Sequence, residues 1–187
     1  ICNASSTQDI PNIASDGNGG ALIAWEDDRN GTTATGIFAQ SVDASGTAQW
    51  TANGLQIGET GLDCRWRAPS TDGHNNDHIV KYSTDYYFVY EVYNSSITDY
   101  SIFARRINGA TGAALGLTSV SNSPTSDETE VRAIFDGVGK TIITWDLQDS
   151  VSTTIHHIRT VSLDNLGIKS YDLYVADGNV VGGGDRS

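Results

Sequence analysis

Short apolar segments alternate with turn residues along the whole chain, and none of them has helical periodicity. Residues 21–25, 87–90 and 141–145 are apolar runs rich in β-branched and aromatic side chains, and each is too short for a helix. No stretch carries a sustained apolar stripe at i, i+3, i+4 and i+7. The pattern therefore predicts an all-β protein.

The first and the last of these runs belong to matching segments. Asp16 precedes Trp25 by nine residues, and Asp136 precedes Trp145 by nine residues. A glycine follows Trp25 after 21 residues and Trp145 after 22 residues. The agreement of turn and aromatic positions indicates that one segment occurs twice.

A third copy lies between these two and is less regular. Asp72-Gly73 matches its start, and nine additional residues separate that pair from the apolar run that ends at Tyr90. After Tyr90 the spacing recovers, since Gly112 follows by 22 residues. We therefore expect one domain over residues 1–187, built from repeats at approximately 1–58, 59–121 and 122–187.

Each repeat predicts four short antiparallel strands. The first ends at the Asp-Gly turn, whose residues tolerate positive φ, and the second is the apolar run. The third is expected at 36–43, 101–107 and about 154–163, and the fourth near 49–57 in the first copy. The stretch 171–181 either completes the last copy or adds to the edge of a neighbouring subunit. Four antiparallel strands in about 55 residues is the size of a β-propeller blade.

The repeat resembles those of large secreted prokaryotic surface proteins with propeller-like blades. The resemblance is carried by Ser15-Asp16-Gly17-x-Gly-Gly20, Trp25-x-Asp27-x-Arg29, Ile37-x-Ala39-Gln40-x-Val42-Asp43-x-x-Gly46 and Trp50-x-x-Asn53-Gly54. It implies a scaffold or a binding face as often as an enzyme. Known propellers have four to eight blades, so three form an incomplete ring, a part of a longer chain, or a ring completed by assembly. We expect self-assembly into a homo-oligomer or filament through unpaired β edges.

Charge and hydropathy indicate an extracellular setting. The net charge of −12 opposes binding to nucleic acid. No apolar run approaches the roughly 20 residues that span a bilayer, so no membrane insertion is expected. The chain begins at Ile1 instead of Met, which we interpret as the loss of a leader from an exported protein. The leading hypothesis is a non-catalytic structural or adhesion protein of the cell surface.

An acidic cluster is the one candidate for catalysis. Glu26, Asp27 and Asp28 supply paired carboxylates of the type that glycoside hydrolases use, which makes a propeller glycosidase fragment an alternative. A carboxylate also recurs at the same place in the other copies, as Glu91 and Asp146. This recurrence favours a structural hydrogen-bonding role, in a turn or between blades, and we expect no enzyme.

Aromatic residues near the additional segment of the second copy give a second alternative, a glycan-binding module. This insertion, 73–85, is a candidate binding loop because departures from a repeat tend to lie in loops on a binding face. Four nearby rings are candidates for stacking on sugars, with core packing as the other interpretation: Trp66, Tyr82, Tyr86 and Tyr87.

Metal sites are only weakly indicated. Asp16, Asn18 and Asp27 are candidate calcium ligands, but the full alternating ligand set is missing and a hydrogen-bonded turn is the other interpretation. His74 and His78 lack a further zinc ligand. No other cofactor is expected.

Two cysteines and three sequons complete the list of candidates. Cys2 and Cys64 are predicted to form a disulfide, as exported β proteins often contain one, with two separate buried thiols as the alternative. Asn3, Asn30 and Asn94 begin glycosylation sequons, whose number is no greater than chance predicts.

Overall fold

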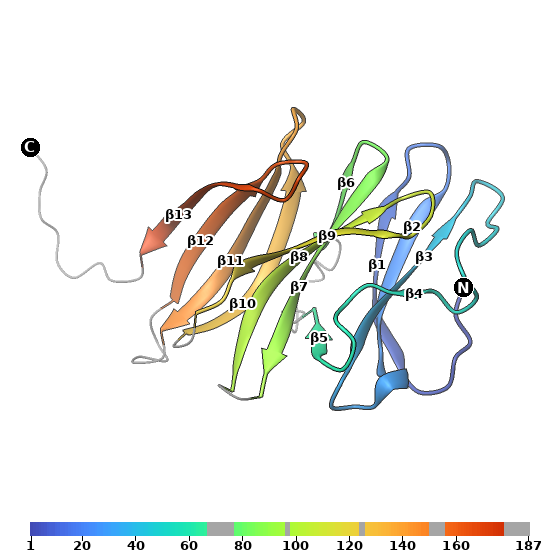
Figure 1. Ribbon diagram of the computed structural model, residues 1–187, viewed down its shortest axis with the longest axis horizontal. Coiled ribbons are helices and arrows are strands. Elements are labelled where there is room, and N and C mark those ends of the chain that lie inside the picture. The colour runs from blue at the N-terminus through green and yellow to red at the C-terminus, as the bar shows by residue number, and fades with distance from the viewer. Residues whose placement is uncertain (67–76, 96–97, 124–125, 150–155, 178–187) are drawn as a thin grey trace, which may run out of the picture.

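Three antiparallel sheets lie side by side in the protein (Figure 1). The computed structural model describes residues 1–66, 77–95, 98–123, 126–149 and 156–177. The sheets fall within the three repeat segments, and the prediction of an all-β fold is confirmed. Among the described residues the sheets do not close into a ring.

Each sheet is made of strands that follow one another in the chain. The first sheet contains β1 (Gln8–Ser15), β2 (Ala21–Asp27), β3 (Gly36–Val42) and β4 (Leu55–Gln56). The middle sheet contains β5 (Asp63–Arg65), β6 (Ile79–Tyr82), β7 (Asp85–Asn94), β8 (Asp99–Asn108) and β9 (Ala114–Ser121). The third sheet contains β10 (Ser126–Phe135), β11 (Thr141–Asp149), β12 (His156–Leu163) and β13 (Lys169–Asp177). The only helical element in the described residues is the 3₁₀ turn η1 (Asp28–Asn30).

The fourth strand of the first sheet is shorter than predicted. The sequence predicts a strand near 49–57, whereas β4 has only two residues. The side chain of Gln40 takes the place of a strand partner: its Oε1 accepts from the Trp50 N–H at 2.8 Å, and its Nε2 donates to the Thr51 carbonyl at 2.8 Å. This side-chain pairing holds Trp50 in the core without a regular ladder.

The additional segment of the middle repeat lies at a different place from the one predicted. Asp72-Gly73, the predicted turn, falls outside the described residues, and the hairpin before β7 turns instead at Ser83–Thr84. Both β5 and β6 pair with β7, so the insertion divides the first strand of the middle sheet.

The same position is irregular in all three sheets. In the first sheet Ile10 and Pro11 form a bulge opposite Trp25, and in the third sheet Glu130 and Val131 form one opposite Trp145. The break between β5 and β6 occurs at the matching point of β7. The chain between β5 and β6 therefore leaves the sheet at the position where the other two sheets have a bulge.

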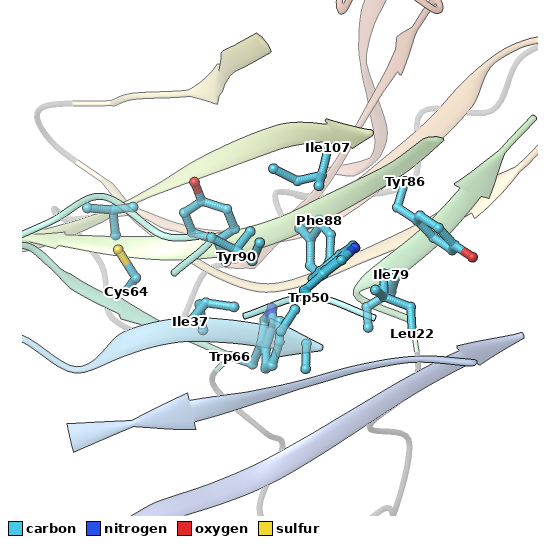
Figure 2. Packing of buried hydrophobic residues seen from close by; sticks show 14 residues of the cluster. Leu22, Ile37, Trp50, Cys64, Trp66, Ile79, Tyr86, Phe88, Tyr90 and Ile107 are labelled. Atoms are coloured by element: carbon cyan, nitrogen blue, oxygen red, sulfur yellow. The ribbon is translucent and has the colours of Figure 1, made fainter. Parts of the chain in front are cut away.

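Two apolar cores lie between the three sheets. Tyr86, Phe88 and Tyr90 project from β7 into the core shared with the first sheet, which Figure 2 shows. Tyr87 and Val89 project from the other face of β7 into the core shared with the third sheet. Because the middle sheet is buried on both faces, residues 86–90 of β7 form an apolar run without polar alternation. The stretch 171–181, up to the last described residue, pairs with β12 and completes the third sheet.

A substitution of Gly54 tests how tightly the first sheet is packed around Trp25. A Cβ there would lie 2.6 Å from Cη2 of Trp25 and 2.8 Å from the Ala39 carbonyl oxygen, at a backbone φ of +82°. We expect Gly54→Ala to lower the free energy of unfolding by about 3 kcal/mol, the sum of overpacking and backbone strain. Urea denaturation measures the loss.

Gly46→Ala is the matched control. Gly46 has the same φ of +82°, but a Cβ there meets no atom within 4 Å. Only the strain remains, so a loss of about 1 kcal/mol is expected. Equal losses for the two variants would contradict the packing described around Trp25.

Candidate functional site

Two buried glutamates connect neighbouring sheets. The backbone N–H of Trp66, in the middle sheet, donates to Oε1 of Glu26 at 2.5 Å. The backbone N–H of Val131, in the third sheet, donates to Oε1 of Glu91 at 3.4 Å. Both donors lie in the irregular segment of the next sheet, and both carboxylates are buried, at 3% and 0% exposure. These contacts support the structural interpretation of the recurring carboxylate.

Asp146 holds the same position in the third sheet but makes a different contact. Its Oδ2 lies 2.7 Å from Nδ1 of His156, a neighbour on β12 of the same sheet. It alternates with Trp145 and Leu147, which face the middle sheet, so Asp146 lies on the opposite face. No further sheet covers that face among the described residues.

The acidic cluster of the first sheet does not converge on one cleft. Glu26 faces the middle sheet, whereas Asp27 projects from the other face of β2. Asp27 is fully buried and accepts from Arg29 Nη2 at 2.5 Å and from Trp25 Nε1 at 2.8 Å. Burial opposes its ionisation, but the hydrogen bonds from Arg29 and Trp25 outweigh burial and lower the pKa of Asp27. Asp28 accepts from the hydroxyl of Thr35 at 2.6 Å.

The predicted disulfide is not formed. Both cysteines are free: Cys64 lies in the core between the first and middle sheets, and the Cys2 sulfur lies 3.2 Å from Arg29 Nη2. Arg29 and its partner Asp27 belong to the other side of the first sheet, so that sheet separates the two sulfurs. Desolvation raises the pKa of the Cys64 thiol to about 12.

Most of the aromatic residues predicted to bind sugars are core residues. Trp66, Tyr86 and Tyr87 are 0%, 4% and 1% exposed, so their ring faces are not available for stacking. Tyr82 is half-buried and packs edge-on against Phe135 of the third sheet at 5.4 Å between ring centroids. The interpretation as core packing accounts for these four residues.

The candidate metal ligands are not brought together. Asp16 precedes β2 and Asp27 ends it, which separates them by about 20 Å or more. Asp16 Oδ1 accepts from the N–H groups of Asn18 and Gly20, so it serves the turn. In the described part of the chain no group of three or more His, Cys, Asp or Glu side chains is placed to hold a metal ion.

The histidines of the sequence analysis are found in unrelated environments. His74 lies outside the described residues. His78 is buried and stacks on Trp66 at 5.5 Å between centroids, and burial lowers the pKa of His78 to about 3. His156 is exposed while His157 is half-buried.

Two of the three sequon asparagines are exposed. Asn3 precedes the first sheet and Asn30 lies in η1, and both side chains are accessible. Asn94 ends β7, and its side chain lies outside the described residues. Glycosylation of these sequons remains a prediction.

A polar groove of about 400 Å³ lies where turns of the first and middle sheets meet. It is lined by Asp16, Asp43, Gln49, Lys81, Thr84 and Tyr86, among others. Many of its polar groups already serve the fold: Asp43 accepts from Ser45 and Gln49, and Lys81 Nζ donates to the Asp16 carbonyl at 2.5 Å. The hydroxyl of Tyr86 has no hydrogen-bond partner among the described residues and points away from the core in Figure 2.

Exposed apolar side chains lie on the outer face of the third sheet, which we call the open face. It includes Ile134, Ile158 and Leu173, which are 67%, 39% and 55% exposed. Ile142, Thr144 and Asp146 project from β11 on the same side. Sequence reasoning predicted exposed edges and missed this face. Its signal in the sequence is the pair Ile142-Ile143, which places one apolar side chain on each side of the sheet.

No protein-family model matches the chain, and a search of curated proteins finds no match.

The pH dependence of stability tests the contact at Glu26. Desolvation raises the pKa of Glu26 to about 7 from an ordinary value of 4.5. Between pH 4.5 and 7 the folded protein holds a proton that the unfolded chain has released, so the free energy of unfolding falls as the pH rises. The full slope of one such group is about 1.4 kcal/mol per pH unit.

The variant Glu26→Gln keeps the acceptor for the Trp66 N–H and removes the proton equilibrium. We expect it to reduce the slope of stability between pH 5 and 7, measured by urea denaturation in a series of buffers. Glu130→Gln, which alters an exposed carboxyl, should leave the slope unchanged. An unchanged slope in Glu26→Gln would show that this carboxyl is ionised in the folded protein.

Proposed function

We propose that the chain is a non-catalytic structural module of an extracellular assembly, a cell-surface or filament subunit that self-associates through uncovered sheet surfaces. The observation that carries the proposal is the open face, where Ile134, Ile158 and Leu173 are exposed on β10, β12 and β13, with polar side chains between them. Exposed apolar side chains on a sheet face that no other described sheet covers are typical of an interaction site.

The edge of the third sheet gives further support. β13 ends the order of that sheet and has nine residues, and no strand pairs with its outer side among the described residues. Val175, on this strand, is 64% exposed. Long exposed edges of this kind readily pair with another chain.

The reactive side chains favour a structural role. Glu26 and Glu91 each join two sheets, Asp27 forms an ion pair with Arg29 of its own repeat, and Asp146 contacts His156 of its own sheet. An acidic net charge suits a protein that functions in salt-containing surroundings. In the described residues, no helix is both long and apolar enough to cross a membrane.

Self-association is tested by sedimentation velocity of the chain over a wide concentration range. We expect the mean particle mass to rise from that of one chain to at least that of two. A single species with the mass of one chain at every concentration, including the millimolar range, would rule out the proposal.

A second candidate function, glycan binding, is favoured by the polar groove alone. Carboxylates, an amide and the Tyr86 hydroxyl, which has no hydrogen-bond partner among the described residues, are groups that bind polyhydroxylated ligands. We expect binding to some member of a glycan array, weakened about tenfold by Tyr86→Phe, which removes only the hydroxyl. Thr118→Val, remote from the groove, is the control. An array without binding would eliminate this candidate.

A further inference from the structure

Positions on the open face of the third sheet have equivalents in the first repeat that another sheet covers. Ile142 and Thr144 follow Asp136 by six and eight residues, as Leu22 and Ala24 follow Asp16. Leu22 and Ala24 are fully buried because the middle sheet covers them. The positions that receive a following sheet in the first repeat are therefore uncovered in the third.

The first sheet has a free face on its opposite side. Ile13 and Ile23 are directly opposite in the β1–β2 ladder, and Ile13 is 51% exposed while Ile23 is half-buried. The residues equivalent to Ile23 in the other two sheets, Phe88 and Ile143, are fully buried against a preceding sheet. Further along this face, Trp25 is already covered by the chain's own loop at Gly54.

The hydrogen bond that joins neighbouring sheets within the chain cannot form in the same way on either of these two faces. Within the chain a glutamate accepts from a bulge N–H of the next sheet, as Glu91 does from Val131. On the open face the equivalent residue is Asp146, one methylene shorter and bound to His156. In the first sheet the second residue of the matching bulge is Pro11, which has no N–H to donate. Neither face therefore offers the glutamate-to-bulge hydrogen bond that joins the sheets within the chain, and a contact between these two faces would rest on apolar packing.

We propose that a second copy of this chain covers the open face, with the Ile13–Ile23 face of its first sheet packed on Ile134 and Ile142. In this arrangement the third sheet of one copy packs on the first sheet of the next, as neighbouring sheets pack on each other within the chain. Beside Ile134 and Ile142 lies a hollow of about 270 Å³ for the side chains of the partner, whose lining also includes Asp77, Arg132, Ala133 and Thr144. Two copies bring six sheets together, which lies within the range of four to eight found in closed propellers. This inference rests on the self-association proposed above.

Single charged substitutions on the two faces test the contact. Ile134→Glu and Ile13→Glu should each weaken self-association at least about tenfold in sedimentation velocity, since each removes one buried isoleucine and adds a buried charge. Val138→Glu is the control: Val138 is 90% exposed but lies in the turn between β10 and β11, outside the proposed contact. Because all three side chains are exposed, the variants should unfold at nearly the urea concentration of the unaltered protein.

Mixing the two face variants tests the pairing of unlike faces. A copy with Ile134→Glu keeps an intact first-sheet face, and a copy with Ile13→Glu keeps an intact open face. An equimolar mixture therefore contains one unaltered combination, and we expect pairs to reappear with the mass of two chains. Failure of the mixture to associate, when each variant alone is weakened, would overturn the pairing of unlike faces.

The outcomes separate this inference from the proposed function. If the unaltered protein assembles and both face variants assemble equally well, the docking of these faces is wrong while self-association stands, and the edge of β13 becomes the site to alter. If the unaltered protein has the mass of one chain at every concentration, both proposals fail.

Discussion

The arrangement of this protein depends on one requirement: the middle sheet must be covered on both faces. Its central strand places Tyr86, Phe88 and Tyr90 on one side and Tyr87 and Val89 on the other, and all five are buried. Burial of these rings provides the main favourable free energy, which is largely non-directional. The carboxylates of Glu26 and Glu91 fix how neighbouring sheets are placed relative to each other. A buried carboxylate is tolerated only where a hydrogen-bond donor lies beside it.

The parts of the fold that were predictable depend on contacts close in sequence. Asp16 accepts from Asn18 and Gly20, and Asp136 accepts from Val138 and Lys140, so each turn is held by its own aspartate. Such local hydrogen bonds leave a recognisable sequence pattern. The spacing from these turns to Trp25 and Trp145 then places the second strand of each outer sheet.

The parts that were not predictable depend on contacts distant in sequence. The predicted strand near 49–57 is shortened because the Gln40 side chain binds the backbone of Trp50 and Thr51, which composition does not indicate. The insertion divides the first strand of the middle sheet at the position where the other two sheets have a bulge, while β7 pairs on both sides of the break. Sequence alignment instead placed the additional residues after a turn, since Asp72-Gly73 resembled the turns of the other repeats.

The candidate site was difficult to predict for a related reason. Aromatic residues serve equally as core residues and as sugar platforms, and only the position of the neighbouring sheet shows that Trp66 and Tyr87 are core residues. The disulfide is predicted from the expected exported setting, whereas in the structure the first sheet separates the two sulfurs. The open face could not be predicted without knowing which sheet packs on which face. Ile142 is as apolar as Leu22 and differs from it only in having no following sheet.

The three sheets pack face to face in the order of the chain, and this order limits how copies of the chain can assemble. Each sheet of the chain packs its preceding and its following neighbour on opposite faces, so the two free faces of the chain are unlike, and continuing the same packing between copies joins one face to the other. Contacts between unlike faces close into a ring if the rotation per sheet sums to a full turn, and otherwise continue into a filament. The outer edge of β13 runs along the side of the sheet, apart from both faces. A ring or filament built through the faces would therefore leave these edges free for strand pairing with other molecules.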